Sequence, residues 1–308
     1  MTPILLDTDP GIDDTMAIFY AMADPEIELV GMTTVFGNVF TPDGTRNALA
    51  LGDLAGQDIP VAEGAHVPLV QPQHPPADFV HGEHGLGNAS LPEPTRKADP
   101  RPAYQFIAET LATRPGEITI VAVGPLTNIV LALQHHPEIT KTAKNVVVMG
   151  GAVRTPGNVN EFAEANIWND PHAAEVVFSA DWDVTLVGLD VTERIQCTPD
   201  DFAPMSNNSP KCGALMNEAA KFYFQFHIDT KGINACFLHD PAAIICAQHP
   251  ELFEMVSTPI TMRVEGDEAG RTIEDPTGST PEIKVCIKAD AAAIKARFLK
   301  HLRSGVLP

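Results

Sequence analysis

Short apolar segments rich in β-branched residues alternate with helix-like segments along most of this chain. The run ITIVAV at 118–123 and the run NVVVMGG at 145–151 have no alternating polar face. Strands of this kind are buried on both faces, which is typical of a parallel sheet covered by helices on each side. The expected strands are 4–7, 27–34, 118–123, 145–151 and 184–191, and the expected helices are 14–23, 45–55, 125–134, 171–179 and 214–226. The sequence therefore predicts an α/β fold with an open, mostly parallel sheet flanked by helices.

Two segments interrupt this alternation. Residues 64–102 contain eight prolines and the stretch HGEHGLGN, and residues 192–212 are also irregular. A loop as long as the first one, inside a compact domain, usually has a functional role. The chain shows no internal repeat, low-complexity tract or clear linker, and 308 residues is a common length for one α/β domain. We expect a single domain over residues 1–308.

The charge balance narrows the possible partners. The chain has 40 acidic and 20 basic residues, a formal net charge of -20. Such a field repels nucleic acids and anionic membranes but tolerates a metal cation or a small neutral ligand. Its five cysteines form no C-x-x-C pair, and no segment resembles a signal peptide or a membrane span. We therefore expect a cytoplasmic protein with reduced thiols and no nucleic-acid or membrane partner.

Four aspartates are crowded into the segment DTDPGIDD at 7–14, between the first expected strand and the first expected helix. Capping of the helix N-terminus explains one or two of these carboxylates, but not Asp7, Asp9, Asp13 and Asp14 together. The Pro-Gly turn within the segment lets Asp9 and Asp14 converge. A hard divalent cation with oxygen ligands, calcium or magnesium, would offset their repulsion. The segment thus predicts a metal site.

Two other kinds of aspartate-rich site fit this segment less well. An EF-hand loop requires a glutamate at its twelfth position and helices on both sides, whereas the twelfth position from Asp7 is Ile18 and a strand precedes it. A phosphatase of the haloacid dehalogenase type has threonine or valine two positions after its second aspartate, where this chain has Gly11. We therefore retain the metal site and set both alternatives aside.

Two further groups of polar residues are candidates for the same site. Asn158, Glu164 and Asn166 precede the helix expected at 171 and suit the binding of sugar hydroxyls, although loop polarity alone would also explain them. His239 and Asp240 precede a proline that starts a helix. Asp240 could cap that helix or complete a metal site, and histidine is the one side chain whose ordinary pKa permits proton donation near neutral pH.

Weaker signals lie in two loops. Thr127 and Asn128 occupy a strand-to-helix turn from which a backbone carbonyl could reach a cation. His81 and His84 lie in the proline-rich loop. A His-x-x-His pair without a third ligand is a weak zinc signal, so we expect a loop that faces the substrate.

Taken together and in this order, the motifs resemble the inosine-uridine-preferring nucleoside hydrolase family. The matching segments are DTDPGIDD, TTVFGN at 33–38, HGEHGLG at 81–87, GPLTN at 124–128, MGG at 149–151, GNVNEFAEAN at 157–166 and HDP at 239–241. The resemblance implies a Rossmann-like nucleoside hydrolase fold and calcium-dependent hydrolysis of a ribonucleoside to ribose and free base. It also implies a homodimer or homotetramer.

The resemblance assigns a role to each matching residue. Calcium is held by the carboxylates of Asp9, Asp14 and Asp240 and by the backbone carbonyl of Thr127. Asp9 also takes the proton from a metal-bound water, and His239 assists departure of the base. The residues that would contact the ribose are Asp13, Asn38, Met149, Asn158, Glu164, Asn166 and Asp240. Those expected near the base are His81 in the long loop and His227, with Tyr223 and Phe226, in the region before the HDP motif.

The chain departs from the family pattern where the base would bind. It has Phe36 where many members have glycine, His84 where serine is usual, and Ala165 where many have phenylalanine. The tryptophans, Trp168 and Trp182, are far from the HDP motif in sequence, so no indole is expected to stack on a purine. We expect a preference for pyrimidine nucleosides or a broad uridine-inosine range. A metal-dependent nucleoside- or sugar-binding protein without catalysis is the alternative; retention of both Asp9 and His239 argues against it.

Overall fold

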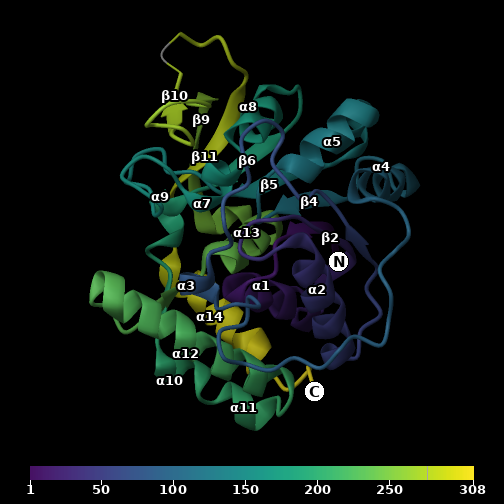
Figure 1. The fold of residues 1–308 in the computed structure, drawn as a ribbon, viewed down its shortest axis with the longest axis vertical. Helices are drawn as coiled ribbons and strands as arrows, with labels where there is room; N and C mark the ends of the chain where they lie inside the picture. The colour runs from purple at the N-terminus through teal and green to yellow at the C-terminus, as the bar shows by residue number, and fades with distance from the viewer. Residues whose placement is uncertain (276) are drawn as a thin grey trace.

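A nine-stranded sheet runs through the computed structural model, which describes residues 1–275 and 277–308 (Figure 1). Its strand order is β10-β9-β11-β6-β5-β4-β1-β2-β3. The strands are β1 Thr2–Thr8, β2 Ile27–Thr34, β3 Val61–Glu63, β4 Thr119–Ala122, β5 Asn145–Met149, β6 Val184–Val187, β9 Phe253–Met262, β10 Thr272–Glu274 and β11 Glu282–Ala289. Neighbouring strands are parallel from β3 to β11, and β9 is antiparallel to both of its neighbours. The predicted α/β fold with a mostly parallel sheet is confirmed.

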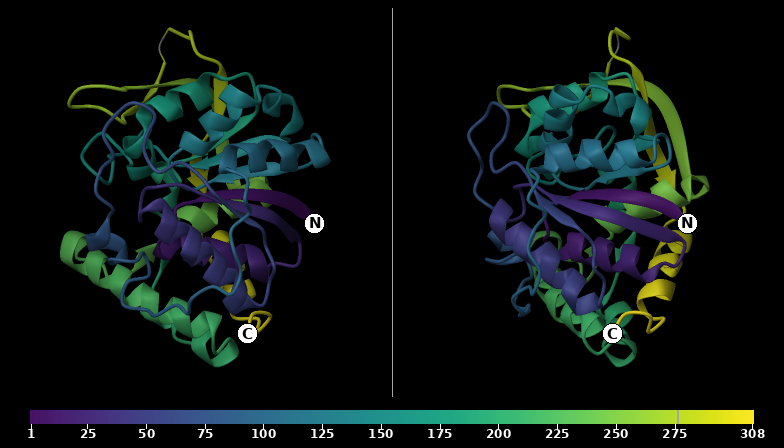
Figure 2. Two further views of the ribbon diagram at one scale, coloured as in Figure 1. Left: turned by 45° about the vertical axis from the view of Figure 1, so that its right-hand side comes forward. Right: turned by 90° about the vertical axis from the view of Figure 1, so that its right-hand side faces the viewer.

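Helices cover both faces of the sheet (Figures 1 and 2). On one face lie α1 Ile12–Ala23, α2 Thr41–Ala55, α12 Cys212–Lys231, α13 His239–Gln248 and α14 Ala291–Leu302. On the other lie α4 Ala103–Thr113, α5 Thr127–His135 and α8 Pro171–Ser179. Strand β1 shows why both layers form, because Ile4 and Leu6 belong to the first core and Leu5 belongs to the second. Burial on both faces accounts for the absence of an alternating polar pattern.

Short elements complete the chain. They are α3 Asp78–His81, α6 Ile139–Thr142, α7 Ala165–Asn169, α9 Leu189–Thr192, β7 Gln196–Cys197, α10 Pro199–Phe202, α11 Met205–Asn208, β8 Cys236–Phe237 and η1 Pro250–Leu252. Strands β7 and β8 form a separate antiparallel pair. Among the described residues, no helix is both long and apolar enough to cross a membrane.

Several predicted boundaries were wrong. The strand expected at 184–191 ends at Val187, and α9 follows, because the Asp190 carboxylate turns back to accept hydrogen bonds from the amides of Val153 and Arg154 at 2.9 and 2.7 Å. The strand expected at 145–151 ends at Met149. The helix expected at 214–226 extends from 212 to 231, and the one expected at 125–134 covers 127–135. The irregular segment 192–212 contains β7, α10 and α11.

The parallel strands place one edge of the sheet under the candidate site. Strands β1, β2, β4, β5 and β6 all end at this edge, and the loops that follow them carry the polar motifs. Ligands of open α/β sheets bind in the crevice outside the carboxyl ends of the strands. The long loop at 64–102 passes over the same region (Figure 2), with only α3 and an isolated bridge at Asp99 as regular structure.

Candidate active site

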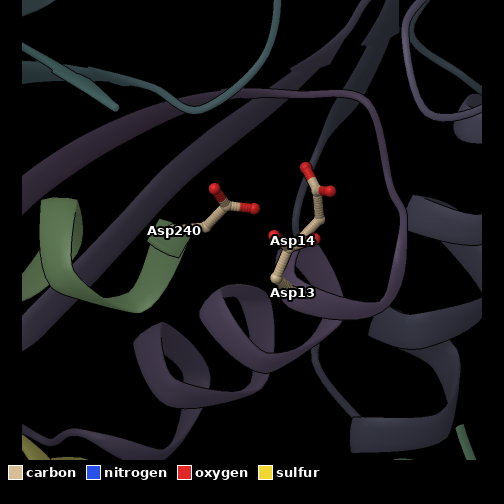
Figure 3. Close-up of side chains that lie close together, drawn as sticks. All are labelled: Asp13, Asp14 and Asp240. Carbon is tan, nitrogen blue, oxygen red and sulfur yellow. The ribbon is translucent and has the colours of Figure 1, made fainter. Parts of the chain in front are cut away.

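Three buried carboxylates meet where two helices begin. Asp13 and Asp14 lie in the first turn of α1, and Asp240 lies in the first turn of α13. One oxygen from each lies within 4.8 Å of the others. In Figure 3 the Asp240 carboxylate points toward the two aspartates of α1. Residues 227 positions apart are thus brought together because both helices start at the carboxyl edge of the sheet.

These carboxylates are short of hydrogen-bond donors. Within the described residues, Asp9 Oδ1, Asp13 Oδ1 and Asp240 Oδ2 are buried and have no partner. Burial, reinforced by the neighbouring carboxylates, raises the pKa of Asp240 and of Asp9 well above the ordinary value, and burial raises the pKa of Asp13 to about 6. A cation would favour the charged forms and satisfy the orphaned oxygens. An all-oxygen donor set fits a hard divalent ion such as calcium or magnesium.

Asp14 differs from the other members of the cluster because donors surround it. It accepts hydrogen bonds from the Thr8 hydroxyl, from the backbone amides of Asp9 and Gly11 at 3.1 and 2.9 Å, and from the Asn38 side chain at 2.9 Å. Its bond to the Gly11 amide caps α1. Asp14 therefore combines capping, the simpler explanation of the motif, with a place in the carboxylate group.

Asp9 lies beside this group in a recess with glycine walls. Its Oδ2 accepts a hydrogen bond from the Asn38 amide at 2.7 Å. A Cβ atom at Gly37 would lie 2.0 Å from Asp9 Oδ2, and one at Gly124 would lie 2.6 Å from Oδ1. The glycines of the TTVFGN and GPLTN motifs are therefore required by the close approach of the Asp9 side chain.

Thr127 begins α5 and is buried. Its hydroxyl donates to Asp170 Oδ2 at 2.7 Å, which leaves the backbone carbonyl as its candidate metal ligand. The neighbouring Asn128 is held by Asp7, whose Oδ1 accepts from its side chain at 2.8 Å. The first aspartate of the motif thus has a structural role. Burial raises its pKa to about 7.

One cavity of about 480 Å³ collects most of the predicted residues. The predicted residues in its lining are Asp13, Asn38, His81, Met149, Asn158, Glu164, Asn166, His227, His239 and Asp240. Asp9, Asp14 and Thr127 do not line it and are buried. The lining combines carboxylates and amides with aromatic rings, and we call these two groups of residues the carboxylate end and the aromatic end of the cavity. An amphipathic ligand with a hydroxyl-rich part and a flat ring fits this division.

The polar residues of the GNVNEFAEAN motif are fixed by backbone groups. Glu164 caps α7 and accepts hydrogen bonds from the amides of Asn166 and Gly151 at 3.0 and 2.9 Å. Asn166 donates to the carbonyls of Val123 at 2.9 Å and Met149 at 3.2 Å. Their orientation is set before any ligand binds, so the motif is more than a polar loop.

The histidines are more buried than the sequence indicated. His239 begins α13, with Nδ1 2.8 Å from the Thr192 hydroxyl, and burial lowers its pKa to about 3. The expectation of an ordinary histidine pKa was therefore wrong, and the imidazole is neutral at neutral pH. Burial also lowers the pKa of His81 and of His227 to about 4. His81 accepts a hydrogen bond from the Ile12 amide at 3.2 Å, which ties the long loop to α1.

Sequence reasoning missed part of the aromatic end. Trp168 and His74 stack with ring centroids 3.5 Å apart, and both line the cavity. The expectation that no indole lies near the site was wrong, because α7 carries Trp168 beside Asn166. The other tryptophan, Trp182, is partly buried against the second core and donates to the Val177 carbonyl. The available sequence signal for Trp168 was its position, two residues after the predicted ribose contact Asn166.

Further lining residues come from α3, from α12 and from the residue that follows α9. Tyr223 and Phe226, both suspected from the sequence, line the cavity, and the Tyr223 hydroxyl lies 3.4 Å from Asp13 Oδ2. Phe79, Glu193 and Lys231 also line it and were not singled out from the sequence. His84 does not line the cavity; its carbonyl accepts a hydrogen bond from Asn47.

Comparisons with known proteins agree with this geometry. The family model described as inosine-uridine preferring nucleoside hydrolase matches residues 4–296. Uridine nucleosidase 1 of Arabidopsis thaliana is 44% identical over 273 residues, covering 88% of this chain and 81% of that protein. The pyrimidine-specific ribonucleoside hydrolase RihA of Escherichia coli (strain SMS-3-5 / SECEC) is 39% identical over 295 residues, 94% of each chain.

Solved structures give the same result. The plant nucleoside hydrolase PpNRh1 is 36% identical with a TM-score of 0.93, covering 98% of this chain and 99% of its own. A purine-preferring ribonucleoside hydrolase from Gardnerella vaginalis is 34% identical with a TM-score of 0.95, covering 99% of both chains. This chain belongs to the inosine-uridine preferring nucleoside hydrolase family and is a ribonucleoside hydrolase.

Proposed function

We propose that this enzyme is a calcium-dependent hydrolase of pyrimidine ribonucleosides, with uridine as its preferred substrate. One observation carries the proposal: buried carboxylate oxygens without hydrogen-bond partners lie at the polar end of a cavity whose other end is aromatic. The polar end suits a cation together with a ribose, and the aromatic end suits a nucleobase.

The proposed calcium ligands are the carboxylates of Asp9, Asp14 and Asp240 and the backbone carbonyl of Thr127. The proximity of Asp14 and Asp240 and the orphaned oxygens of Asp9 and Asp240 support this set. A bound divalent cation supplies Lewis acidity, which lowers the pKa of a coordinated water and orients the ribose hydroxyls. Asp13, whose orphaned oxygen belongs to the same group, is assigned to the ribose.

Asp9 is the proposed general base. Among the described residues, its Oδ1 has no hydrogen-bond partner while Oδ2 is held by the Asn38 amide, so one oxygen of the carboxylate is open to the attacking water. The recess formed by Gly37 and Gly124 fixes the side chain in one position. Removal of the proton makes the water nucleophilic as it approaches the anomeric carbon.

The ribose contacts would stabilise the reaction's charge as well as hold the sugar. Cleavage of a glycosidic bond passes through an oxocarbenium-like state, and nearby carboxylates stabilise its positive charge. Asp13 and Glu164 provide such groups in the cavity lining. Asn38, Asn158 and Asn166 offer hydrogen bonds to hydroxyls, with Met149 as an apolar contact for the sugar.

His239 is proposed to assist departure of the base. Because the imidazole is neutral, it acts by donating a hydrogen bond and does not release a proton from an imidazolium. His81, His227 and Tyr223 share this side of the cavity, with the rings of Tyr223 and His227 4.5 Å apart. These side chains would surround the base as it leaves.

The proposed uridine preference rests on the relatives. Proteins described as uridine nucleosidases or as pyrimidine-specific hydrolases are 39 to 44% identical to this chain, whereas the purine-preferring structure is 34% identical. Incubation with uridine, cytidine, inosine and adenosine, followed by measurement of released ribose, tests the proposal. We expect the highest kcat/KM for uridine. A higher value for inosine would reject the base preference, and no release from any of the four would reject the enzymatic function.

We also propose a cytoplasmic homodimer or homotetramer. The family resemblance supports the oligomer, and the five buried cysteines, which are all free thiols, support a reducing compartment. Light scattering that gives the mass of one chain would reject the oligomer.

A further inference from the structure

The buried hydroxyl of Thr192 lies against the His239 ring. Thr192 ends α9 and is fully buried, and its Oγ1 lies 2.8 Å from His239 Nδ1. Within residues 1–275 and 277–308, this ring nitrogen is the one hydrogen-bond partner of the hydroxyl. The pair connects the segment after β6 to the start of α13.

The direction of this hydrogen bond follows from burial. A buried hydroxyl that only accepts would leave its own proton unpaired, which is unfavourable. If Thr192 donates, its proton is satisfied and Nδ1 of His239 serves as the acceptor. A neutral imidazole that accepts at Nδ1 carries its single proton at Nε2.

The surroundings of His239 agree with a neutral ring. No carboxylate oxygen of the described residues lies within 4.0 Å of either ring nitrogen, so no direct ion pair holds an imidazolium. The ring packs against Phe237, with centroids 5.6 Å apart. His239 lines the cavity. Its Nε2 is not one of the buried side-chain atoms that lack a hydrogen-bond partner.

We propose that Thr192 is a positioning residue that donates its hydroxyl proton to His239 Nδ1, so that the imidazole presents an N–H at Nε2 to the departing base. The inference rests on the proposed function of His239. As the glycosidic C–N bond breaks, its electron pair moves onto the base, and Nε2–H donates a hydrogen bond to the carbonyl oxygen where negative charge accumulates. The proton stays on His239, and the released base takes a proton from solvent.

The tautomer can be observed directly in the unliganded enzyme. In ¹⁵N-histidine-labelled protein at neutral pH, with the His239 signals assigned by their loss in His239→Asn, we expect an unprotonated Nδ1 and a protonated Nε2. In Thr192→Val the His239 signals should shift toward a mixture of tautomers, whereas Thr192→Ser should preserve the pattern. A protonated Nδ1 in the wild type would overturn the proposal without any measurement of activity.

Steady-state kinetics test whether the hydrogen bond from Thr192 to His239 affects catalysis. Thr192→Val retains the shape of the side chain and removes the hydroxyl, and we expect kcat for uridine to fall about 10- to 100-fold, the usual effect of losing a group that orients a functional histidine. Hydrolysis of p-nitrophenyl riboside, whose leaving group needs no stabilisation, should be unchanged. Thr192→Ser should restore most of the loss. Thr119→Val is the matched control, because Thr119 is also buried and also loses a hydroxyl bond, to Asn145, at the opposite end of the sheet.

The outcomes distinguish the role of Thr192 from the proposed function of His239. An equal loss on both substrates would overturn the positioning role and mean that Thr192 supports the ribose or metal end. Full activity of Thr192→Val, with a large loss in His239→Ala, would overturn the proposal and leave the function of His239 intact. Failure of the wild type to cleave nucleosides would reject the proposed function, while the NMR measurement would still decide the tautomer.

Discussion

The two ends of the cavity are built in different ways. At the carboxylate end, the side chains come from strand ends and helix starts, and backbone amides or neighbouring side chains hold them, as the donors around Asp14 do. At the aromatic end, the walls come from the long loop, α7 and α12, and rings pack on one another, as His74 does on Trp168. Phe79 at this end is 73% exposed. The rigid end suits the chemistry shared by a family, and the looser end suits selection of the base.

At the carboxylate end, the largest expected effect on kcat/KM comes from removing a ribose hydroxyl from the substrate. If Asp13, Glu164 and Asn166 hold ribose hydroxyls, 2′-deoxyuridine leaves buried polar groups unpaired. We expect kcat/KM about 10⁴-fold below that of uridine, the scale on which sites built for a hydroxyl reject its absence. Steady-state kinetics on the two nucleosides measure the ratio. Comparable values would show that these residues serve only the structure.

Removal of a carboxylate should affect metal content and catalysis together. In Asp9→Ala and Asp14→Ala we expect loss of bound calcium and a fall in kcat for uridine of about 10²- to 10⁴-fold, the range for loss of a general base. Asp24→Asn is the control, because Asp24 is buried at the other end of α1, where it accepts from the Tyr20 hydroxyl at 3.0 Å. It should lower the melting temperature and leave the calcium content unchanged. Retention of calcium in both alanine variants would exclude these ligands.

His239 lies where the two ends meet, and its removal should distinguish them. In His239→Ala we expect kcat for uridine to fall about 10²- to 10³-fold, the effect of losing one donor to a developing anion. Calcium content and hydrolysis of p-nitrophenyl riboside should be unchanged, because the ribose end is intact. A parallel loss on p-nitrophenyl riboside would place the role of His239 at the ribose or the metal.

The smallest effect is expected at the aromatic end. Trp168→Leu removes the ring that stacks on His74, and we expect KM for uridine to rise about 10-fold or less, since such contacts contribute about 0.5–1.5 kcal/mol beyond the area they bury. Trp182→Leu is the control, because Trp182 is partly buried against the core and does not line the cavity. It should reduce stability and leave KM unchanged. A similar rise in KM for both variants would attribute the effect to general destabilisation.

The difference between the two ends of the cavity also explains which parts of the site could be predicted from the sequence. The carboxylate end follows from local motifs, because a parallel strand must end at the carboxyl edge and the residues after it must face the crevice. The position of Asp13 was predictable for this reason, whereas the family resemblance placed Glu164, Asn166 and Asp240 in the same site. Asp240 follows β8, which lies outside the main sheet.

The rest depends on packing between distant segments. The stack of His74 on Trp168 requires the proline-rich loop to cross α7, and nothing in either segment indicates it. The low pKa of His239 arises from burial beneath elements that follow β6 and α12. Strands β9, β10 and β11 at one side of the sheet were missed, because they lack the continuous apolar runs of the strands that are buried on both faces.

The central claim is that the buried carboxylates hold a calcium ion required for nucleoside hydrolysis. The most direct test is ribose release from uridine by protein stripped of metal with a chelator and verified by elemental analysis, before and after calcium is restored. The account predicts that activity falls to background and returns with calcium. Return of activity with magnesium alone would retain the cation site and reject calcium as the ion that it requires. Full turnover by the verified metal-free enzyme would contradict the claim.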